Sequence, residues 1–179
     1  MDDMVKAAMA KWPNVPDCYG WLALDARGDW YMRDEAAQAQ GNKGSRLQHD
    51  KLIAFIGRNY MADTEGRWYF QNGPQRVYVE LEDTPWVWRL MPDGRVCAHT
   101  GEQMHITAAG CDERGRLYLV SPRGWGLVHT ADMDMAATRI ERGEWTLETW
   151  DSSELPRLGG FVRSPQAWLM AKKSRSETG

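Results

Sequence analysis

Cysteine and histidine side chains in the second half of the chain are the residues most suited to holding a metal. Cys97 and His99 share one face of an expected strand, and four thiol or imidazole groups can complete a tetrahedral zinc site. None of the spacings matches a known zinc finger or ribbon, so we assign no metal ligand and no cofactor. A metal-dependent hydrolase stays as a third alternative, built from Cys97, His99, His105, Cys111 and His129.

A second set with chemical potential is the carboxylate pair Glu80 and Glu82, followed directly by Asp83. Two carboxylates on one face can carry out acid–base hydrolysis. An alternating strand with a solvated outer face gives the same pair without any catalysis. The chain also lacks a Gly-x-Ser-x-Gly elbow and a phosphate-binding loop. No catalytic residue is assigned, and the question of enzymatic activity stays open, with the balance against it.

Tryptophan and arginine are unusually common, with ten tryptophans in the chain. Arginine stacks on aromatic rings and binds carboxylates or phosphates through two nitrogens, so the pair can mark a ligand surface. Filling the core is the competing explanation for most of these rings. If some line a pocket, the candidate ligand-binding residues are Trp30, Arg46, Arg58, Trp68, Arg76, Tyr78 and Trp86.

One short segment recurs along the chain. Residues 25–32 return in close form at 63–70 and, at an exact offset, at 112–119; looser copies lie at 92–96 and 142–147. Each copy predicts a tight turn with glycine at positive φ, leading into a β-strand. The spacing is too short and uneven for a propeller. It favours one small domain copied once.

The elements around these segments are mostly short strands. We expect a helix over residues 3–11 and one main helix over 45–58, begun by a Ser45 to Gln48 capping box. Residues 36–44 are predicted to form a loop. The predicted fold is α+β and β-rich, with tandem duplicated modules of antiparallel hairpins. The expected organisation is an N-terminal arm (1–11), a first module (12–97), a second module (98–170) and a flexible tail (171–179).

The first half also resembles a known family. The order of Pro16 and Cys18, an Asp-x-x-Gly-x-Trp-Tyr hairpin, a capped helix with Arg46, and the run 77–86 is similar to an uncharacterised proteobacterial domain-of-unknown-function family. The likeness covers about residues 12–90. It implies a duplicated domain, a second half that resembles pleckstrin-homology folds, and a role linked to signal transduction. It supplies no catalytic residues.

The net charge and the hydropathy of the chain limit the classes of partner that it is expected to bind. The net charge of −3 gives no basic field for nucleic acid, and no apolar run approaches a membrane span. The acidic N-terminus and the three unpaired cysteines predict a cytoplasmic protein, as a monomer or homodimer. We expect a non-enzymatic regulatory or ligand-binding protein whose site, for an unknown small ligand, lies between the modules. The alternative is an interaction module that docks a protein partner through an aromatic face or edge strand.

Overall fold

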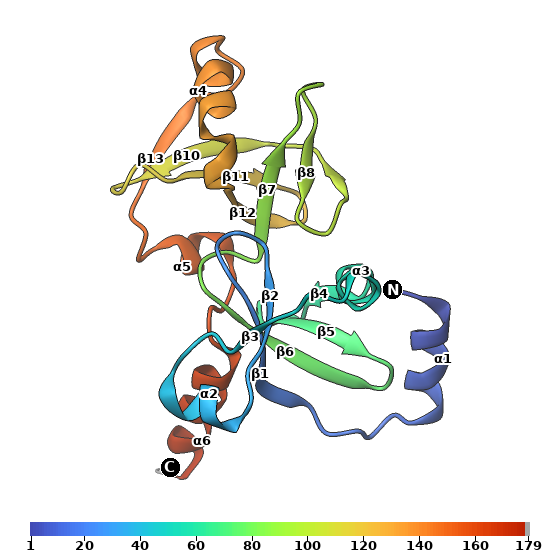
Figure 1. Ribbon diagram of the computed structural model, residues 1–179. Helices are drawn as coiled ribbons and strands as arrows, with labels where there is room; N and C mark the ends of the chain where they lie inside the picture. Colours follow the sequence, from blue (N-terminus) through green and yellow to red (C-terminus); the bar gives the residue numbers. More distant parts are fainter. Residues whose placement is uncertain (178–179) are drawn as a thin grey trace. The chain divides into compact units, whose positions relative to one another are not determined.

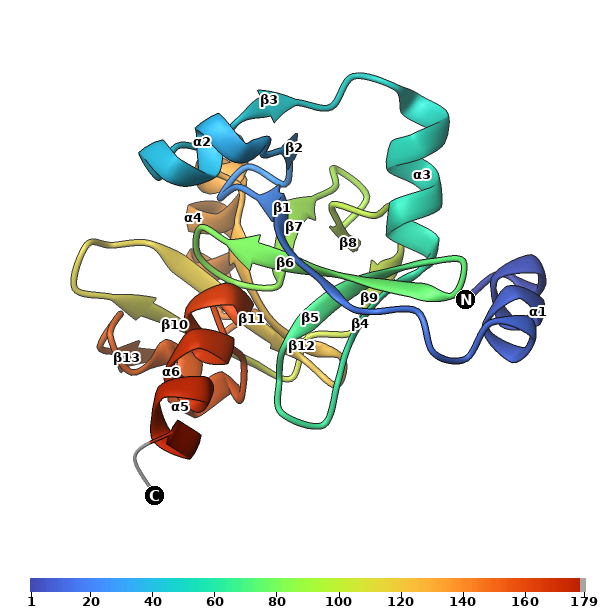
Figure 2. The same ribbon diagram turned by 90° about the horizontal axis from the view of Figure 1, so that it is seen from below.

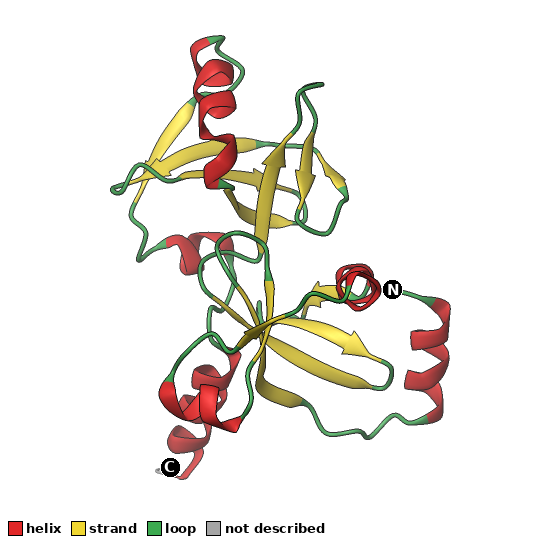
Figure 3. Cartoon of the chain, viewed as in Figure 1, coloured by secondary structure: helices red, strands yellow, loops and turns green. Residues whose placement is uncertain are grey.

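The computed structural model describes residues 1–177, which form two compact units (Figure 1). Unit 1 consists of Met1–Asp25, Asp29–Glu82 and the segment from Phe161 onward, and unit 2 of Ala26–Gly28 and Asp83–Gly160. Each unit holds one mixed β-sheet with a few helices (Figure 3), so the fold is α+β and β-rich. In the described part of the chain, every helix is too short or too polar to cross a membrane.

The sheet of unit 1 joins two three-stranded meanders. The first three strands and the last three each pair antiparallel in chain order, and β6 lies parallel to β1 between them. The sheet order is β3 (Ser45–Arg46), β2 (Trp30–Met32), β1 (Cys18–Leu24), β6 (Gln75–Leu81), β5 (Trp68–Asn72) and β4 (Tyr60–Ala62).

Unit 2 repeats this arrangement strand for strand. Two meanders again meet through a parallel pair, here β12 and β7, and β13 adds a seventh strand parallel to β10 at the outer edge. The hairpins are antiparallel, as the sequence predicted, and the parallel pairs join one meander to the next. The sheet order is β13 (Leu147–Trp150), β10 (Ala108–Asp112), β11 (Leu117–Ser121), β12 (Gly124–Val128), β7 (Trp86–Leu90), β8 (Val96–Ala98) and β9 (Gln103–Met104).

The division into units differs from the expected boundary at residue 97. It falls after Glu82, because β7 pairs with β12 and β8 in the second sheet. The segment after Gly160 returns to unit 1, where the Leu81 amide donates to the Arg163 carbonyl and Arg67 forms a bridge with Val162.

The helices match the sequence predictions unevenly. Helix α1 (Asp3–Lys11) lies where it was expected, and in Figure 2 the N-terminus lies beside the end of α3, where the Asp2 amide donates to the Asn59 side chain. The remaining helical segments are α2 (Glu35–Gln40), α3 (Asp50–Arg58), the 3₁₀ turn η1 (Thr130–Asp132), α4 (Met133–Glu141), α5 (Leu155–Gly159) and α6 (Pro165–Glu177).

Three expectations about these segments are corrected. The main helix begins at Asp50 rather than at residue 45, since Ser45 and Arg46 pair with β2 and the His49 ring accepts the Leu52 amide as cap. The expected loop at 36–44 contains most of α2. The expected flexible tail is helical through Glu177, and its last two residues lie outside the described chain.

Large aromatic side chains fill both cores. In unit 1, Trp30 meets Tyr60 edge to face at 5.2 Å, and both are buried. In unit 2, Trp86 and Trp88 stack at 5.9 Å, and the Trp88 Nε1 donates to the Leu119 carbonyl at 2.8 Å. Gly126 faces this pair, where an added Cβ would lie 2.3 Å from Trp88 Nε1. Close approach of β12 to these rings therefore requires glycine.

Candidate functional site

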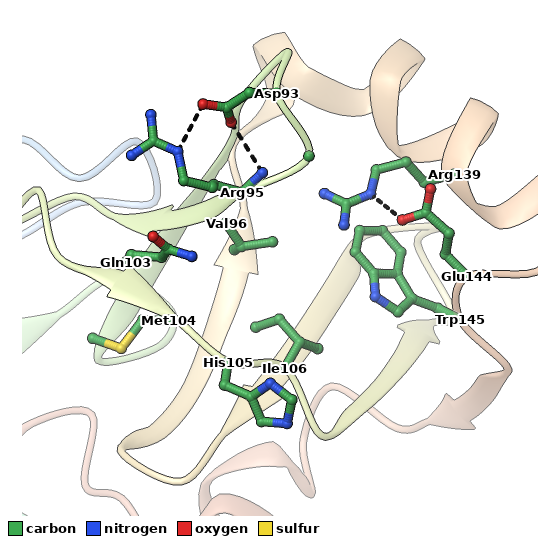
Figure 4. Close-up of a pocket in the computed structure, with 11 residues that line it drawn as sticks. Asp93, Arg95, Val96, Gln103, Met104, His105, Ile106, Arg139, Glu144 and Trp145 are labelled. Atoms are coloured by element: carbon green, nitrogen blue, oxygen red, sulfur yellow. Dashed lines mark hydrogen bonds and ion pairs between the residues drawn. The ribbon is translucent and has the colours of Figure 1, made fainter.

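A cavity of unit 2 has a volume of about 580 Å³ and opens between the β7–β8 turn, strand β9 and the end of α4 (Figure 4). Its lining combines charged, amide, imidazole, indole and aliphatic side chains. They are Asp93, Gly94, Arg95, Val96, Gln103, Met104, His105, Ile106, Arg139, Glu144 and Trp145.

The C-terminus of α4 builds one wall of this cavity. Gly143 adopts φ +74°, its amide donates to the Ile140 carbonyl at 2.9 Å, and the Glu144 amide donates to the Arg139 carbonyl at 3.1 Å. These two bonds form a Schellman motif. The segment at 142–147 is therefore a helix stop and not the hairpin turn that its likeness to the repeat suggested. The motif brings Glu144 and Trp145 back against the Arg139 side chain.

Arg139 is held on two sides. Its Nε donates to Glu144 Oε2 at 2.6 Å, and its guanidinium carbon lies 4.4 Å from the centre of the Trp145 ring. Only 13% of the side chain is exposed. Its Nη1 is buried and has no hydrogen-bond partner within residues 1–177. In Figure 4 the terminal nitrogens of Arg139 point away from α4 into the space between the walls.

The opposite wall is a hairpin turn with its own ion pair. The Arg95 amide donates to Asp93 Oδ1 at 3.1 Å, and Arg95 Nε donates to Oδ2 at 2.7 Å. Together these two bonds lower the pKa of Asp93 below its ordinary value, so the carboxylate stays ionised at neutral pH. Gln103 on β9 and His105 directly after it also line the cavity, with His105 beside Ile106 in Figure 4.

This arrangement is suited to binding. Two guanidinium groups are balanced by two carboxylates, an indole offers a flat apolar surface, and one buried donor has no acceptor. The lining contains no serine, threonine, cysteine or lysine, and its carboxylates, Asp93 and Glu144, are each paired with an arginine.

The seven residues predicted to bind ligand lie elsewhere. Trp30, Trp68 and Tyr78 are buried in unit 1, and Trp86 is buried in unit 2. On the surface of unit 1, Arg46 pairs with Asp29, Arg58 pairs with Asp2, and Arg76 lies 4.8 Å over the Tyr69 ring. None of the seven residues lines the 580 Å³ cavity. The predicted site between the modules and the docking alternative stay predictions.

The cysteine and histidine set does not assemble. Within residues 1–177 there is no group of three His, Cys, Asp or Glu side chains that could hold a metal ion. The His99 Nδ1 accepts the Val87 amide and the His129 Nδ1 accepts the Ala131 amide, so these rings serve the backbone. The described residues therefore give no support to the metal-dependent hydrolase, which stays a prediction.

Sequence reasoning missed Arg139 and Trp145. A signal for the helix was present, since Gly143 follows an arginine-containing segment as a helix stop does. The contact between the two side chains depends on the fold of the stop and on the neighbouring hairpin.

The fold and this cavity define a β-rich α+β protein with a ligand-sized pocket in its second unit. The chain belongs to the family DUF2944, whose model matches residues 1–166 and is described as "Protein of unknown function (DUF2946)". None of the curated proteins compared with the chain matches it.

Two solved structures are similar to the chain. A DUF1285 family protein from Silicibacter pomeroyi DSS-3 is 13% identical, with a TM-score of 0.49 over 69% of this chain and 71% of that one. A second, from Shewanella baltica OS155, is 19% identical, with a TM-score of 0.46 over 66% of this chain and 91% of that one.

Proposed function

We propose that this protein is a non-enzymatic ligand-binding protein whose second unit takes a small carboxylate-bearing molecule. The observation that carries the proposal is the Arg139 guanidinium. Glu144 and Trp145 hold it, its terminal nitrogens point into the cavity (Figure 4), and its buried Nη1 has no hydrogen-bond partner among residues 1–177. A buried donor without a partner costs about 1–3 kcal/mol. An acceptor oxygen on a ligand would remove that cost and form a charge-assisted hydrogen bond.

The charge balance of the cavity narrows the ligand class. Arg95 and Arg139 are each paired with a carboxylate, Asp93 and Glu144. A ligand with several negative charges would meet these two acids without matching cations. A single carboxylate on a small, flat, apolar body fits better, since Trp145 and the aliphatic lining can cover its ring.

The shared strand order of the two sheets supports a second part of the proposal. Both units consist of two meanders joined through a parallel pair, in the same chain order. We attribute this to duplication of one ancestral unit, with β13, α4 and the cavity wall at Trp145 added to the second copy. A regulatory role would then depend on this added cavity wall of unit 2.

Isothermal titration calorimetry with benzoate, acetate and ATP tests the ligand class. We expect benzoate to bind, acetate to bind more weakly because it lacks the ring, and ATP to bind least. Arg139→Gln removes the charged fork and should weaken benzoate binding at least about tenfold, which corresponds to roughly 1.4 kcal/mol.

Arg157→Gln is the matched control. Arg157 Nε also donates to a glutamate at 2.6 Å, on Glu154, but it is exposed and lies outside the cavity lining. The control should bind benzoate like the natural protein. The proposal fails if none of the three probes binds, or if the two arginine variants lose affinity equally.

A further inference from the structure

Unit 1 has a cavity of its own, with a volume of about 270 Å³. Strands β1, β2 and β6 form its floor, and the segment between α2 and β3 closes one side. Its lining is Ala23, Leu24, Asp25, Tyr31, Arg33, Gly41, Asn42, Lys43, Glu80, Leu81 and Glu82.

The acidic part of this cavity is a deeply placed carboxylate. Only 3% of the Asp25 side chain is exposed. Its Oδ1 accepts the Asp29 amide at 2.9 Å, and its Oδ2 accepts the Tyr31 hydroxyl at 3.2 Å. These hydrogen bonds fix the orientation of the carboxylate, so its negative charge lies at one point of the cavity.

The protein's own ammonium group lies at that point. Lys43 Nζ is 2.8 Å from Glu82 Oε2, 3.6 Å from Asp25 Oδ2 and 5.6 Å from the centre of the Tyr31 ring. The hydrogen bond to Glu82 and the two negative charges raise the pKa of Lys43, although partial burial opposes this. Two carboxylates beside an aromatic face are the groups that recognise an alkylammonium ion.

Lys43 reaches this site from a short connecting segment. It lies between Gly41 and Gly44, which both adopt positive φ, and 52% of its side chain is exposed. The backbone of the segment is held by Arg33, whose Nε donates to the Asn42 carbonyl. The ammonium is therefore supplied by a long, half-exposed side chain, whereas the carboxylates belong to the sheet and its edges.

We propose that this cavity is a binding site for a primary alkylammonium group, and that Lys43 occupies it as a built-in competitor. The apolar floor of Leu24 and Leu81 would contact the alkyl chain of the ligand. The site is independent of the carboxylate site in unit 2, because it uses different residues and opposite charges.

Propylammonium chloride is the probe. Its binding to the natural protein, Lys43→Ala and Lys43→Met is followed by two-dimensional amide NMR, with sodium chloride and tetramethylammonium chloride as controls. Removing the competitor should tighten propylammonium binding at least about tenfold in both variants. The shifted amides should lie around Asp25, Tyr31 and Glu82.

A double variant separates a specific site from general charge effects. Lys43→Ala with Glu82→Gln keeps the fold but removes one of the two carboxylates that hold the ammonium, so propylammonium affinity should fall again. Equal affinity in the natural protein and both single variants would overturn the proposal. So would equal shifts with sodium or tetramethylammonium, or no binding to any variant.

Discussion

The two units carry the same hairpin at the same place in their sheets, and the arginine that pairs with its aspartate has different surroundings in each. In unit 1 the hairpin joins β4 to β5 around Asp63, and in unit 2 it joins β10 to β11 around Asp112. In both, the carboxylate Oδ1 accepts the amides two and four residues ahead, at 2.9 and 3.0 Å for Asp63 and at 3.0 and 2.9 Å for Asp112. In both, the arginine four residues ahead donates Nε to Oδ2 at 2.8 Å.

The surroundings of the arginine distinguish the two hairpins. Arg67 in unit 1 lies over aromatic rings, 4.1 Å from the centre of Trp168 and 4.9 Å from that of Tyr78. Arg116 in unit 2 instead reaches a second buried carboxylate, with Nη1 2.5 Å from Asp83 Oδ2. Each arginine has a second carboxylate and an aromatic ring beside it. Arg67 Nη2 lies 3.0 Å from the exposed Glu65, and the guanidinium carbon of Arg116 lies 5.7 Å from the centre of the Tyr118 ring. The two units therefore differ in that the second carboxylate is buried only beside Arg116, whereas the closer ring contacts belong to Arg67.

The tyrosine that completes each cluster also comes from a different strand. Tyr78 on β6 donates to Asp63, whereas Tyr118 on β11 donates to Asp112. In the sheets, Tyr78 is paired with Tyr69 and Tyr118 with Leu127. The same hydroxyl–carboxylate contact is thus reached from either strand of a pair, which shows that the carboxylate is the fixed part of the motif.

Asp112→Ala should produce the largest loss of stability in this comparison. The side chain is fully buried and accepts bonds from two amides, Arg116 and Tyr118. Removing one partner of a buried pair costs about 3 kcal/mol or more, and we expect about 3 kcal/mol from urea unfolding. Asp63→Ala should cost less, about 2 kcal/mol, since Arg67 keeps its stacking.

Asp93→Ala is the control for that experiment. It removes the same type of Asp–Arg turn contact at an exposed position, and the free energy of unfolding should change little. Comparable losses for the alanine variants at 93 and 112 would show that burial does not set the strength of this motif.

Replacing the arginines by lysine should give the next largest effect. Arg116 contacts two carboxylates through three nitrogens, which a single ammonium group cannot reproduce. We expect Arg116→Lys to cost about 2 kcal/mol and Arg67→Lys about 1 kcal/mol, because an ammonium can still lie over Trp168. Urea unfolding of both variants checks this order. The reverse order would mean that the ring contacts of Arg67 stabilise it more than the buried second carboxylate, Asp83, stabilises Arg116.

Much of this fold was accessible from the sequence because its signals are local. Glycine corners marked the hairpins, and the alternation of Val77, Val79 and Leu81 marked β6. The parallel pairing of β6 with β1 joins segments more than fifty residues apart, and no local pattern encodes it. The capping box at Ser45 failed for a related reason: pairing with Met32 in β2 outweighed a local helix signal.

The candidate sites were harder to predict than the fold. The candidate ligand residues named from the sequence were tryptophans, arginines and one tyrosine, all of them between residues 30 and 86. The pair with a free donor is Arg139 with Trp145, formed where a helix stop folds back on its own last turn. The composition shows that tryptophan and arginine are common in the chain. Which pair can bind a ligand depends on which arginine nitrogen has no hydrogen-bond acceptor after folding.

Lowering the pH should destabilise the Asp112 hairpin, because the Asp112 carboxylate becomes protonated. Burial alone would raise the pKa of Asp112, but hydrogen bonds from the Arg116 amide and guanidinium outweigh it and lower the pKa below 3.8. A lowered folded-state pKa means that the contribution is complete above the ordinary value and is lost as pH falls through the folded value. The stability gap between the natural protein and Asp112→Asn should therefore be constant from pH 7 to 5 and narrow below pH 3.8. A gap that stays constant down to pH 2 would contradict the assignment.

The smallest expected effect concerns Asp25, the aspartate of the first copy of the repeated hairpin, which has Asp29 where the copies at Asp63 and Asp112 have arginine. Because the local cation is missing, Lys43 supplies it from outside the turn, and Lys43→Ala should cost no more than about 1 kcal/mol. Asp29→Arg would restore the arrangement seen at Asp63 and Asp112. In a double-mutant cycle, the Lys43→Ala cost should then fall by about 0.5 kcal/mol, since Asp25 has gained a partner of its own. Arg46→Gln, which removes the present partner of Asp29, is the control and should leave the Lys43 cost unchanged. Strictly additive effects of Asp29→Arg and Lys43→Ala would show that the residue four positions after the aspartate does not determine which cation pairs with its carboxylate.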